Sequence, residues 1–293
     1  MNEDARTLVV KDVGEIDTPL IVCGGAYSNL EAMTALFAAA AKLDIPPERI
    51  IHTGDVVAYC ADPEATTELL KNSGALALLG NVEESLFIGA DDCGCGFEEG
   101  TACDTLSAQW YSHADRQIGS GLRDWMKSLP HQIIFRCGDR RALVVHGNVT
   151  SINTFVFESL AAATFQQDFQ KTTADIIIAG HTGLPFTRHF PGGRTWHNSG
   201  ALGMPANDGT ARVWYSIAYP DDQFGLRFVH KPLDYDHQTA ARKMHEAGLP
   251  DAYANALVTG LWPNVDWLPE AERKQTGVRI DFELRDKAKG AAA

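Results

Sequence analysis

The sequence predicts an α/β fold in which two β-sheets pack face to face and helices cover their outer sides. Two observations support this fold class. From residue 20 to residue 79, apolar strands alternate with amphipathic helices, which is typical of layered α/β proteins. From residue 132 to residue 229, apolar segments separated by short Gly-containing turns indicate antiparallel hairpins. A sandwich of two sheets with helices outside accounts for both halves.

The first half contains three strands and two helices in alternation. Residues 20–27 form an apolar strand, and Ser28 with Glu31 predicts a capping box for a helix that ends near residue 42. A strand at 49–53 precedes a helix that begins at Asp62-Pro63. The third strand is expected at 75–79. Functional residues should then follow the carboxyl ends of these strands, where open α/β sheets bind ligands.

The second half begins after a long loop at 91–104, which is rich in Gly, Cys and acidic residues. A loop of this length in a compact domain is often functional. Helical stretches are expected at 105–129 and over most of 151–171. Strands are expected at 132–136, 142–145, 175–178, 186–190, 194–197, 211–218 and 225–229.

The chain divides into one large domain and two smaller parts. Residues 1–233 hold all the predicted strands. Residues 234–277 read as a helical C-terminal appendage that packs on the domain or on a partner subunit, so a homo-oligomer could form through it. We interpret residues 278–293 as a tail.

Composition excludes several classes of protein. A net charge of −13 argues against binding to duplex nucleic acid, which requires a basic face. No apolar run is long enough to span a bilayer, and the first residues lack the pattern of a secretory signal. We therefore expect a cytoplasmic protein whose six cysteines are reduced.

Four side chains with the chemistry of metal ligands each follow an apolar run. They are Asp55, Asn81, His146 and His181. One carboxylate, one amide oxygen and two imidazoles can hold a divalent transition metal. A single His or Asp after a strand is usually structural, and the alternative here is a set of inherited residues that only bond to one another. Four such positions in this order favour a metal site.

The order of these blocks resembles that of the calcineurin-like metallophosphoesterases, in the branch of bacterial phosphodiesterases and diadenosine tetraphosphatase-like proteins. The resemblance runs from about Leu20 to about Tyr215. Where that family has Asp-x-His, Gly-Asp, Gly-Asn-His-Asp/Glu, a strand-end His and Gly-His-x-His, this chain has Gly25-Ala-Tyr27, Gly54-Asp55, Gly80-Asn-Val-Glu83, His146-Gly147 and Gly180-His-Thr-Gly183. A segment beginning at Asn198 also resembles the family. The resemblance implies a four-layer α/β/β/α fold.

The resemblance implies two metal positions, of which this chain keeps the ligands of one. Asp55, Asn81, His146 and His181 match the ligands of the retained position, and Asp55 is the bridging ligand in the family. The other position loses its ligands at Gly25, Tyr27 and Gly183, and Val82 replaces a His that assists the leaving group. We expect one transition metal ion per chain: Mn, Fe or Zn, divalent or trivalent.

The predicted activity is hydrolysis of a small phosphorylated substrate, a phosphomonoester or phosphodiester, by metal-activated water. Asp55 is expected to act with Glu83 and Asn198, which would orient water or substrate. Tyr27 is a candidate substrate-binding hydroxyl, or its ring fills the space of the missing ligand. His197 is a candidate substrate-binding residue, or a packed histidine at a strand end.

The cysteines offer a second candidate site. Cys93, Cys95 and Cys103, together with Cys60, could supply thiolates to a metal, but the spacing is unlike that of known zinc motifs. The simpler interpretation is a reduced loop that covers the site. Two alternative functions remain open: a non-catalytic relative that binds a phosphorylated ligand or a partner, and a repurposed metal or redox enzyme that uses these cysteines.

Two aromatic segments could line a substrate cleft or belong to the core or an interface. They are Trp110-Tyr111 and the segment from Trp262 to Trp267. We favour core or interface, because large aromatic side chains dominate both.

Overall fold

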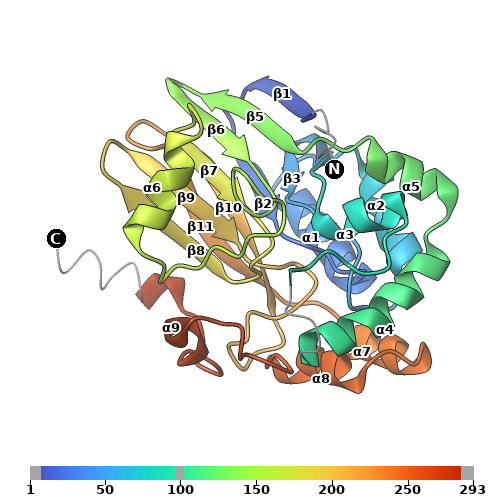
Figure 1. The fold of residues 1–293 in the computed structure, drawn as a ribbon. Helices are drawn as coiled ribbons and strands as arrows, with labels where there is room; N and C mark the ends of the chain where they lie inside the picture. Colours follow the sequence, from blue (N-terminus) through green and yellow to red (C-terminus); the bar gives the residue numbers. More distant parts are fainter. Residues whose placement is uncertain (1–7, 97–101, 285–293) are drawn as a thin grey trace, which may run out of the picture.

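The computed structural model describes residues 8–96 and 102–284 and has four layers, as the sequence predicts. Two sheets form the two inner layers (Figure 1). The first sheet has the order β1 (Val10–Glu15), β5 (Gln132–Cys137), β6 (Arg140–Val144), β7 (Ile176–Ala179), β9 (Arg194–Ser199), β8 (Pro185–Phe190). The second has the order β11 (Gly225–Leu233), β10 (Val213–Asp221), β2 (Leu20–Cys23), β3 (Ile50–His52), β4 (Leu76–Ala77).

Helices cover both outer faces. On the second sheet lie α1 (Leu30–Lys42), α2 (Pro63–Ser73), α3 (Asn81–Ile88), α4 (Ala102–Gln117), α5 (Ser120–Lys127), α7 (His237–Glu246) and α8 (Asp251–Thr259). On the first sheet lies α6 (Ala162–Gln170), and the short α9 (Glu270–Arg273) lies near the C-terminal end. None of these helices, within the ranges that the structure describes, is long and apolar enough to cross a membrane.

Strand β2 shows how the sequence builds the layers. Side chains alternate between the two faces of a strand. Leu20 and Val22 point into the core between the two sheets, whereas Ile21 and Cys23 pack under the helices. All four side chains are buried. A strand that is apolar at every position is therefore required here, because both of its faces are covered.

The carboxyl ends of parallel strands bring the candidate residues together. β2, β3 and β4 are parallel neighbours in one sheet, and β6, β7 and β9 are parallel neighbours in the other. Asp55 follows β3, Asn81 follows β4, His146 follows β6 and His181 follows β7. The two sheets therefore each contribute two of the four side chains to one edge of the sandwich.

Several local expectations were wrong. Residues 151–161 form turns instead of a helix, and a break at residues 118–119 divides the helical stretch into α4 and α5. The cap of α1 is Asn29, whose side chain accepts a hydrogen bond from the amide of Ala32 at 3.1 Å. Ser28 instead accepts from the amide of Ala58, so the predicted capping box does not form.

Two elements were not predicted at all. β1 pairs in parallel with β5, more than a hundred residues later, and its side chains are largely exposed. Such a strand has no apolar pattern of its own and depends on its neighbour. α3 begins at a candidate ligand and spans only 8 residues, which is too short for a clear helical period.

The segment from residue 234 onwards packs on the main domain. α7 contacts α1 and α8, and Met244 is fully buried in the same core as α1. Lys243 places its ammonium group 2.6 Å from Glu31 and 2.7 Å from Asp62. Beyond residue 277, Phe282 lies with its ring centroid 5.3 Å from that of Trp214, so the first residues of the expected tail also pack on the sandwich.

Candidate metal centre

Four donor atoms of the predicted ligands converge at the edge of the sandwich. Nε2 of His146 lies 3.0 Å from Oδ1 of Asn81, 3.1 Å from Oδ2 of Asp55 and 3.2 Å from Nδ1 of His181. Nδ1 of His181 lies 4.0 Å from the same Asp55 oxygen. All four side chains are buried. The set of four that the sequence predicted is therefore assembled in one place.

These separations fit one transition metal ion. Ligand atoms about 2.0–2.2 Å from a metal, at the angles of tetrahedral or octahedral coordination, lie about 3.0–3.5 Å apart. The three separations from His146 fall in this range. Asp55, His146 and His181 are also the one group of three or more His, Cys, Asp or Glu residues in the described ranges that could hold an ion.

His146 is oriented by the backbone of the strand that precedes Asp55. Its Nδ1 lies 2.6 Å from the carbonyl oxygen of Thr53, which fixes the proton on Nδ1 and leaves Nε2 for the centre. Burial acts to lower the pKa of His146, but the Asp55 carboxylate and the Thr53 carbonyl raise it above its ordinary value. Nε2 of His146 must be free of a proton to bind a metal, so metal binding by His146 is expected to weaken as the pH falls.

Asp55 and His181 are held in forms that bind metals. Burial acts to raise the pKa of Asp55, but the two histidines together hold that pKa well below its ordinary value. Burial lowers the pKa of His181. An ionised carboxylate and a neutral imidazole are the forms that ligate transition metals.

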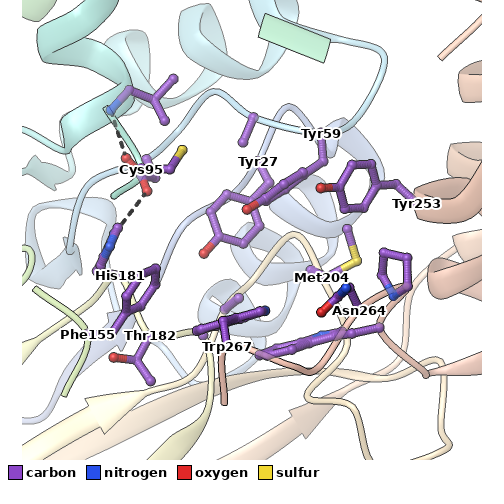
Figure 2. Close-up of a pocket in the computed structure, with 17 residues that line it drawn as sticks. Tyr27, Tyr59, Cys95, Phe155, His181, Thr182, Met204, Tyr253, Asn264 and Trp267 are labelled. Atoms are coloured by element: carbon purple, nitrogen blue, oxygen red, sulfur yellow. Dashed lines mark hydrogen bonds and ion pairs between the residues drawn. The ribbon is translucent and has the colours of Figure 1, made fainter. Parts of the chain in front are cut away.

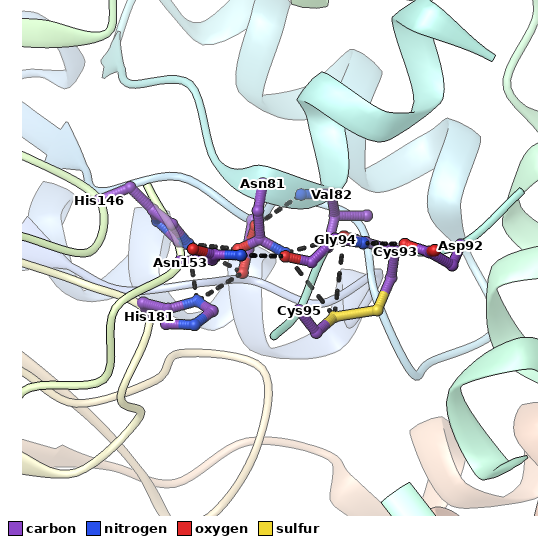
Figure 3. Close-up of a disulfide and its surroundings, with 10 residues drawn as sticks. Asn81, Val82, Asp92, Cys93, Gly94, Cys95, His146, Asn153 and His181 are labelled. Atoms are coloured by element: carbon purple, nitrogen blue, oxygen red, sulfur yellow. Dashed lines mark hydrogen bonds and ion pairs between the residues drawn. A yellow bond between two sulfur atoms is a disulfide. The ribbon is translucent and has the colours of Figure 1, made fainter. Parts of the chain in front are cut away.

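Asn81 is aimed at the centre by the cysteine loop. Its Nδ2 donates to the carbonyl of Cys93 at 2.9 Å, which leaves Oδ1 facing His146. Cys93 and Cys95 are joined by a disulfide, and Gly94 between them has a φ of 62° (Figure 3). In this conformation, which favours glycine, the two cysteines approach to a Cα separation of 5.3 Å. The disulfide loop thus positions a candidate metal ligand.

Neither the alternative thiolate site nor the reduced loop is found at Cys93 and Cys95. Cys93 and Cys95 are not reduced in this structure, contrary to our expectation, because their sulfurs are bonded to each other. Cys60 is buried with its sulfur 3.9 Å from the carbonyl of Gly203, and burial raises the pKa of its thiol. The side chain of Cys103 lies outside the part of the chain that the structure describes.

Glu83 lies behind Asp55 instead of facing a substrate. It is fully buried, and its carboxylate accepts hydrogen bonds from the amides of Asp55 at 2.7 Å, Gly80 at 3.0 Å and Val57 at 3.2 Å. Burial and the charge of Asp55 raise the pKa of Glu83 to about 7. The predicted direct contact with water or substrate is therefore corrected: Glu83 positions the loop that carries Asp55.

Asn198 has a similar positioning role for the loop that carries His181. Its Nδ2 donates to the carbonyl of Gly180 at 2.7 Å, and its Oδ1 accepts from the amide of Gly200 at 2.9 Å. The side chain is 1% exposed, so its amide is bonded to backbone and is closed to solvent. The predicted contact of Asn198 with water or substrate is corrected in the same way.

His197 does not reach the centre. Side chains alternate along β9, so His197 points into the sandwich while Asn198 points toward the site. Its Nδ1 lies 2.9 Å from the hydroxyl of Thr187, and its ring stacks on Phe228 at 3.8 Å. The interpretation of His197 as a packed strand-end histidine is the correct one.

The backbone at the centre adopts a conformation that is rare for residues other than glycine. Tyr27, Asp55 and His181 have φ values of 53°, 60° and 58°. Each such residue costs on the order of 1–3 kcal/mol, and strain of this kind gathers at functional sites. Gly80 is also required, because a Cβ there would lie 2.6 Å from the Glu83 carboxylate.

Aromatic rings occupy the position of the missing metal ligands. A side chain at Gly25 would collide with the ring of Tyr27. A Cβ at Gly183 would lie 3.6 Å from the indole of Trp262. The interpretation of Tyr27 as a ring that fills this space therefore fits the structure, and Gly25 and Gly183 offer no side-chain ligand atom for a second metal.

The crowding at Gly25 gives a test by double-mutant cycle. We expect Gly25→Asp alone to lower the free energy of unfolding by about 2–3 kcal/mol, because the added side chain overpacks the Tyr27 ring. In a Tyr27→His background the same change should cost about 1–2 kcal/mol less. Urea unfolding measures both values. Gly119→Asp is the control, since a Cβ there meets nothing within 4 Å; equal costs in the two backgrounds would contradict the placement of the ring.

A cavity of about 70 Å³ opens beside the metal ligands. Asp55 and His181 form part of its wall, and so does Val82, which offers no proton to a leaving group. Burial and the nearby charges of Asp55 and Glu83 raise the pKa of Tyr27, so its hydroxyl stays protonated. Figure 2 shows this hydroxyl pointing into the cavity, so Tyr27 can also donate a hydrogen bond there.

Five of the other residues that line this cavity are aromatic: Tyr59, Phe155, Tyr253, Trp262 and Trp267. Trp262 and Trp267 thus lie at a cleft, whereas Trp110 is 1% exposed and belongs to the core. Phe155 stacks on His181 with ring centroids 4.2 Å apart. No local pattern marks Phe155 as a site residue, because it lies in a turn segment that only the fold brings to His181.

Comparison with known proteins agrees with this fold. A metallophosphoesterase from Sphaerobacter thermophilus is 22% identical, with a TM-score of 0.64, over 84% of this chain and 100% of its own. A hypothetical protein from Pyrococcus horikoshii OT3 is 14% identical, with a TM-score of 0.70, over 83% of this chain and 99% of its own. An uncharacterized protein from Methanocaldococcus jannaschii is 23% identical over 84% of this chain and 99% of its length.

The four-layer fold and the group of Asp55, His146 and His181 at the strand ends define a metallophosphoesterase with a candidate metal site. The model of the calcineurin-like phosphoesterase superfamily domain matches residues 20–218. The chain belongs to this superfamily. The matched residues contain all four predicted ligands and stop short of the aromatic segment with Trp262 and Trp267.

Proposed function

We propose that this protein is a metal-dependent phosphoesterase with a mononuclear centre. The observation that supports the proposal most directly is the convergence of four donor atoms on one point, with separations of 3.0–3.2 Å from Nε2 of His146. A transition metal held by Asp55, Asn81, His146 and His181 would act as a Lewis acid toward a phosphoryl oxygen and make water a better nucleophile at neutral pH.

The residues of the chain supply orientation and exclude water. The carbonyls of Thr53 and Cys93 fix the two ligands His146 and Asn81, and the apolar wall beside Val82 limits contact of the substrate with bulk water. The hydroxyl of Tyr27 can donate a hydrogen bond to a phosphoryl oxygen. Because Val82 offers no proton at the position of the missing acid, the catalytic factor of about 10²–10⁴ that a general acid at this position supplies is lost. We therefore infer slow hydrolysis of a restricted set of esters.

The metal content tests the number of ions. Protein purified without oxygen and loaded with Mn, Fe or Zn should contain one ion per chain by elemental analysis, and it should hydrolyse bis(p-nitrophenyl) phosphate. Two ions per chain would contradict the mononuclear centre, and none would contradict the metal site. Stoichiometric metal without turnover would instead support a non-catalytic relative that binds phosphorylated ligands.

A further inference from the structure

Two rows of aromatic rings face each other across the cavity beside the metal ligands. One row consists of Tyr27, Tyr59 and Tyr253, with ring centroids 5.0 and 4.7 Å apart. Figure 2 shows this row on one side of the cavity and Trp267, from the C-terminal segment, on the other. We call the space between the two rows the aromatic slot.

The second row is a continuous series of ring contacts that begins at His181. Phe155 stacks on His181, and Trp267 lies 4.7 Å from Phe155. Trp262 then lies parallel to Trp267, with an interplanar angle of 6° and ring centroids 5.6 Å apart. An indole donor fixes this stack, because Nε1 of Trp262 donates to the carbonyl of Pro205 at 2.6 Å. The slot is therefore built from anchored rings.

The lining of the slot carries no positive charge. Among the described residues that line this cavity there is neither Lys nor Arg, and the titratable ones are Asp55, His181 and three tyrosines. A polyphosphate chain or a second phosphoryl group would have no cation to pair with here. The part of a ligand that enters the slot must therefore be uncharged.

Val82 also restricts which leaving groups can depart, and this restriction is independent of the charge of the slot. It lines the same cavity, where the family has a histidine, and its side chain cannot donate a proton. A phenolic oxygen has a pKa of about 10, compared with about 15.7 for water, to which alkoxides are similar. An aryl oxide can therefore depart without a proton donor, whereas an alkoxide cannot do so readily.

We propose that the aromatic slot binds the planar, uncharged aryl group of aryl phosphoesters, so that the leaving group is an aryl oxide, which is released as a phenol. This inference rests on the proposed phosphoesterase function. In the reaction, the oxygen of one water forms a bond to phosphorus and the bond from phosphorus to the aryl oxygen breaks. The electron pair of that bond leaves on the aryl oxygen, which takes up a proton from solvent in place of the proton that the water has lost.

Binding to the slot can be tested without turnover. Isothermal titration calorimetry should show phenylphosphonate binding about tenfold more tightly than ethylphosphonate to the metal-loaded protein, since stacking on aromatic rings contributes about 1–3 kcal/mol. Trp267→Leu should bring this ratio close to one, and Trp267→Phe should restore most of it. Trp125→Leu is the control, because Trp125 lies in α5 outside this cavity.

Three phosphate monoesters distinguish the effect of ring stacking on KM from the effect of the leaving group on kcat. Phenyl phosphate and benzyl phosphate both carry a ring, but only phenyl phosphate releases a phenol, and ethyl phosphate has neither feature. We expect similar KM values for phenyl and benzyl phosphate, a higher KM for ethyl phosphate, and a kcat for phenyl phosphate at least about 100-fold above that for benzyl phosphate.

The outcomes distinguish this inference from the proposed function. Equal binding of the two phosphonates, or a ratio unchanged by Trp267→Leu, would overturn the aromatic slot even if esters are hydrolysed. Equal kcat values for phenyl and benzyl phosphate would overturn the assignment of the leaving group. If no ester is hydrolysed but phosphonate binding depends on Trp267, the slot is supported and the phosphoesterase function is refuted.

Discussion

Replacing Asp55 with asparagine is expected to lower metal affinity by more than about 100-fold and to abolish measurable phosphodiester hydrolysis. Asp55 is the one anionic ligand of the set, and its oxygen lies 3.1 Å from Nε2 of His146. Residues that only support metal ligands already contribute about 10- to 100-fold to affinity. Removing a charged ligand should cost more. Competition with a chelator gives the affinity, and elemental analysis gives the metal content.

Asp168→Asn is the matched control for this variant. Asp168 is also a buried aspartate, 3% exposed, but it lies in α6 on the outer face of the first sheet and is not one of the candidate ligands. The control should keep both its metal and its activity. Unchanged hydrolysis in Asp55→Asn would refute the metal-dependent mechanism. Loss of metal with unchanged binding of a phosphonate would favour the non-catalytic alternative.

Replacing Glu83 with leucine is expected to lower the free energy of unfolding by about 4 kcal/mol. Three buried backbone amides, those of Val57, Asp55 and Gly80, would lose their acceptor. An unsatisfied buried donor costs about 1–3 kcal/mol. Glu83→Gln should cost less, about 1–2 kcal/mol, because it keeps one acceptor oxygen and removes the repulsion with Asp55. Urea unfolding of the metal-free protein measures both changes.

Glu64→Gln controls for the loss of a glutamate charge. Glu64 is exposed in the first turn of α2, so this change should remain within about 0.5 kcal/mol of the original protein. If Glu83→Leu were no more destabilising than this control, the three hydrogen bonds would not hold the Asp55 loop in solution. A loss of activity in Glu83→Gln without a loss of stability would point to a direct role in the reaction.

The fold and the metal ligands could be predicted because both follow from simple repeating patterns. Apolar strands that alternate with amphipathic helices require covered sheets, and parallel strands end at a common edge. Asp55, Asn81, His146 and His181 follow four such strands, so their convergence follows from the topology. The number of residues between these four side chains does not itself predict that they meet, because two of them follow strands of one sheet and two follow strands of the other.

The roles of the neighbouring residues could not be predicted, since they depend on which way a side chain turns at the strand end. Glu83 and Asn198 have the chemistry of catalytic groups, but both form hydrogen bonds with the backbone instead. Glu83 accepts from the amide of Asp55, and Asn198 donates to the carbonyl of Gly180. His197 is one residue from Asn198 and points to the opposite face. The pairing of Cys93 with Cys95 depends on the positive φ of Gly94. A glycine can adopt this conformation, but its presence in the sequence does not predict that it will.

The aromatic slot was missed because its members come from segments far apart in the chain. Tyr27, Phe155 and Trp267 are separated by more than a hundred residues each, and none belongs to a periodic pattern. Aromatic residues in a Pro-rich segment, such as Trp262 and Trp267, are as typical of a core as of a binding site. Only the position of these tryptophans relative to His181 shows that they line a binding site instead of belonging to the core.

The rings that replace the missing ligands also constrain how this branch of the family can evolve. Tyr27 blocks a side chain at Gly25, so restoring a ligand at position 25 alone brings a clash and no metal. A Cβ at Gly183 would only be in ordinary contact with Trp262, and the φ of 75° at Gly183 is what disfavours a side chain there. Natural selection can therefore restore position 25 only together with position 27. Among close relatives, positions 25 and 27 should accordingly vary together: either both carry the metal-binding pattern or neither does.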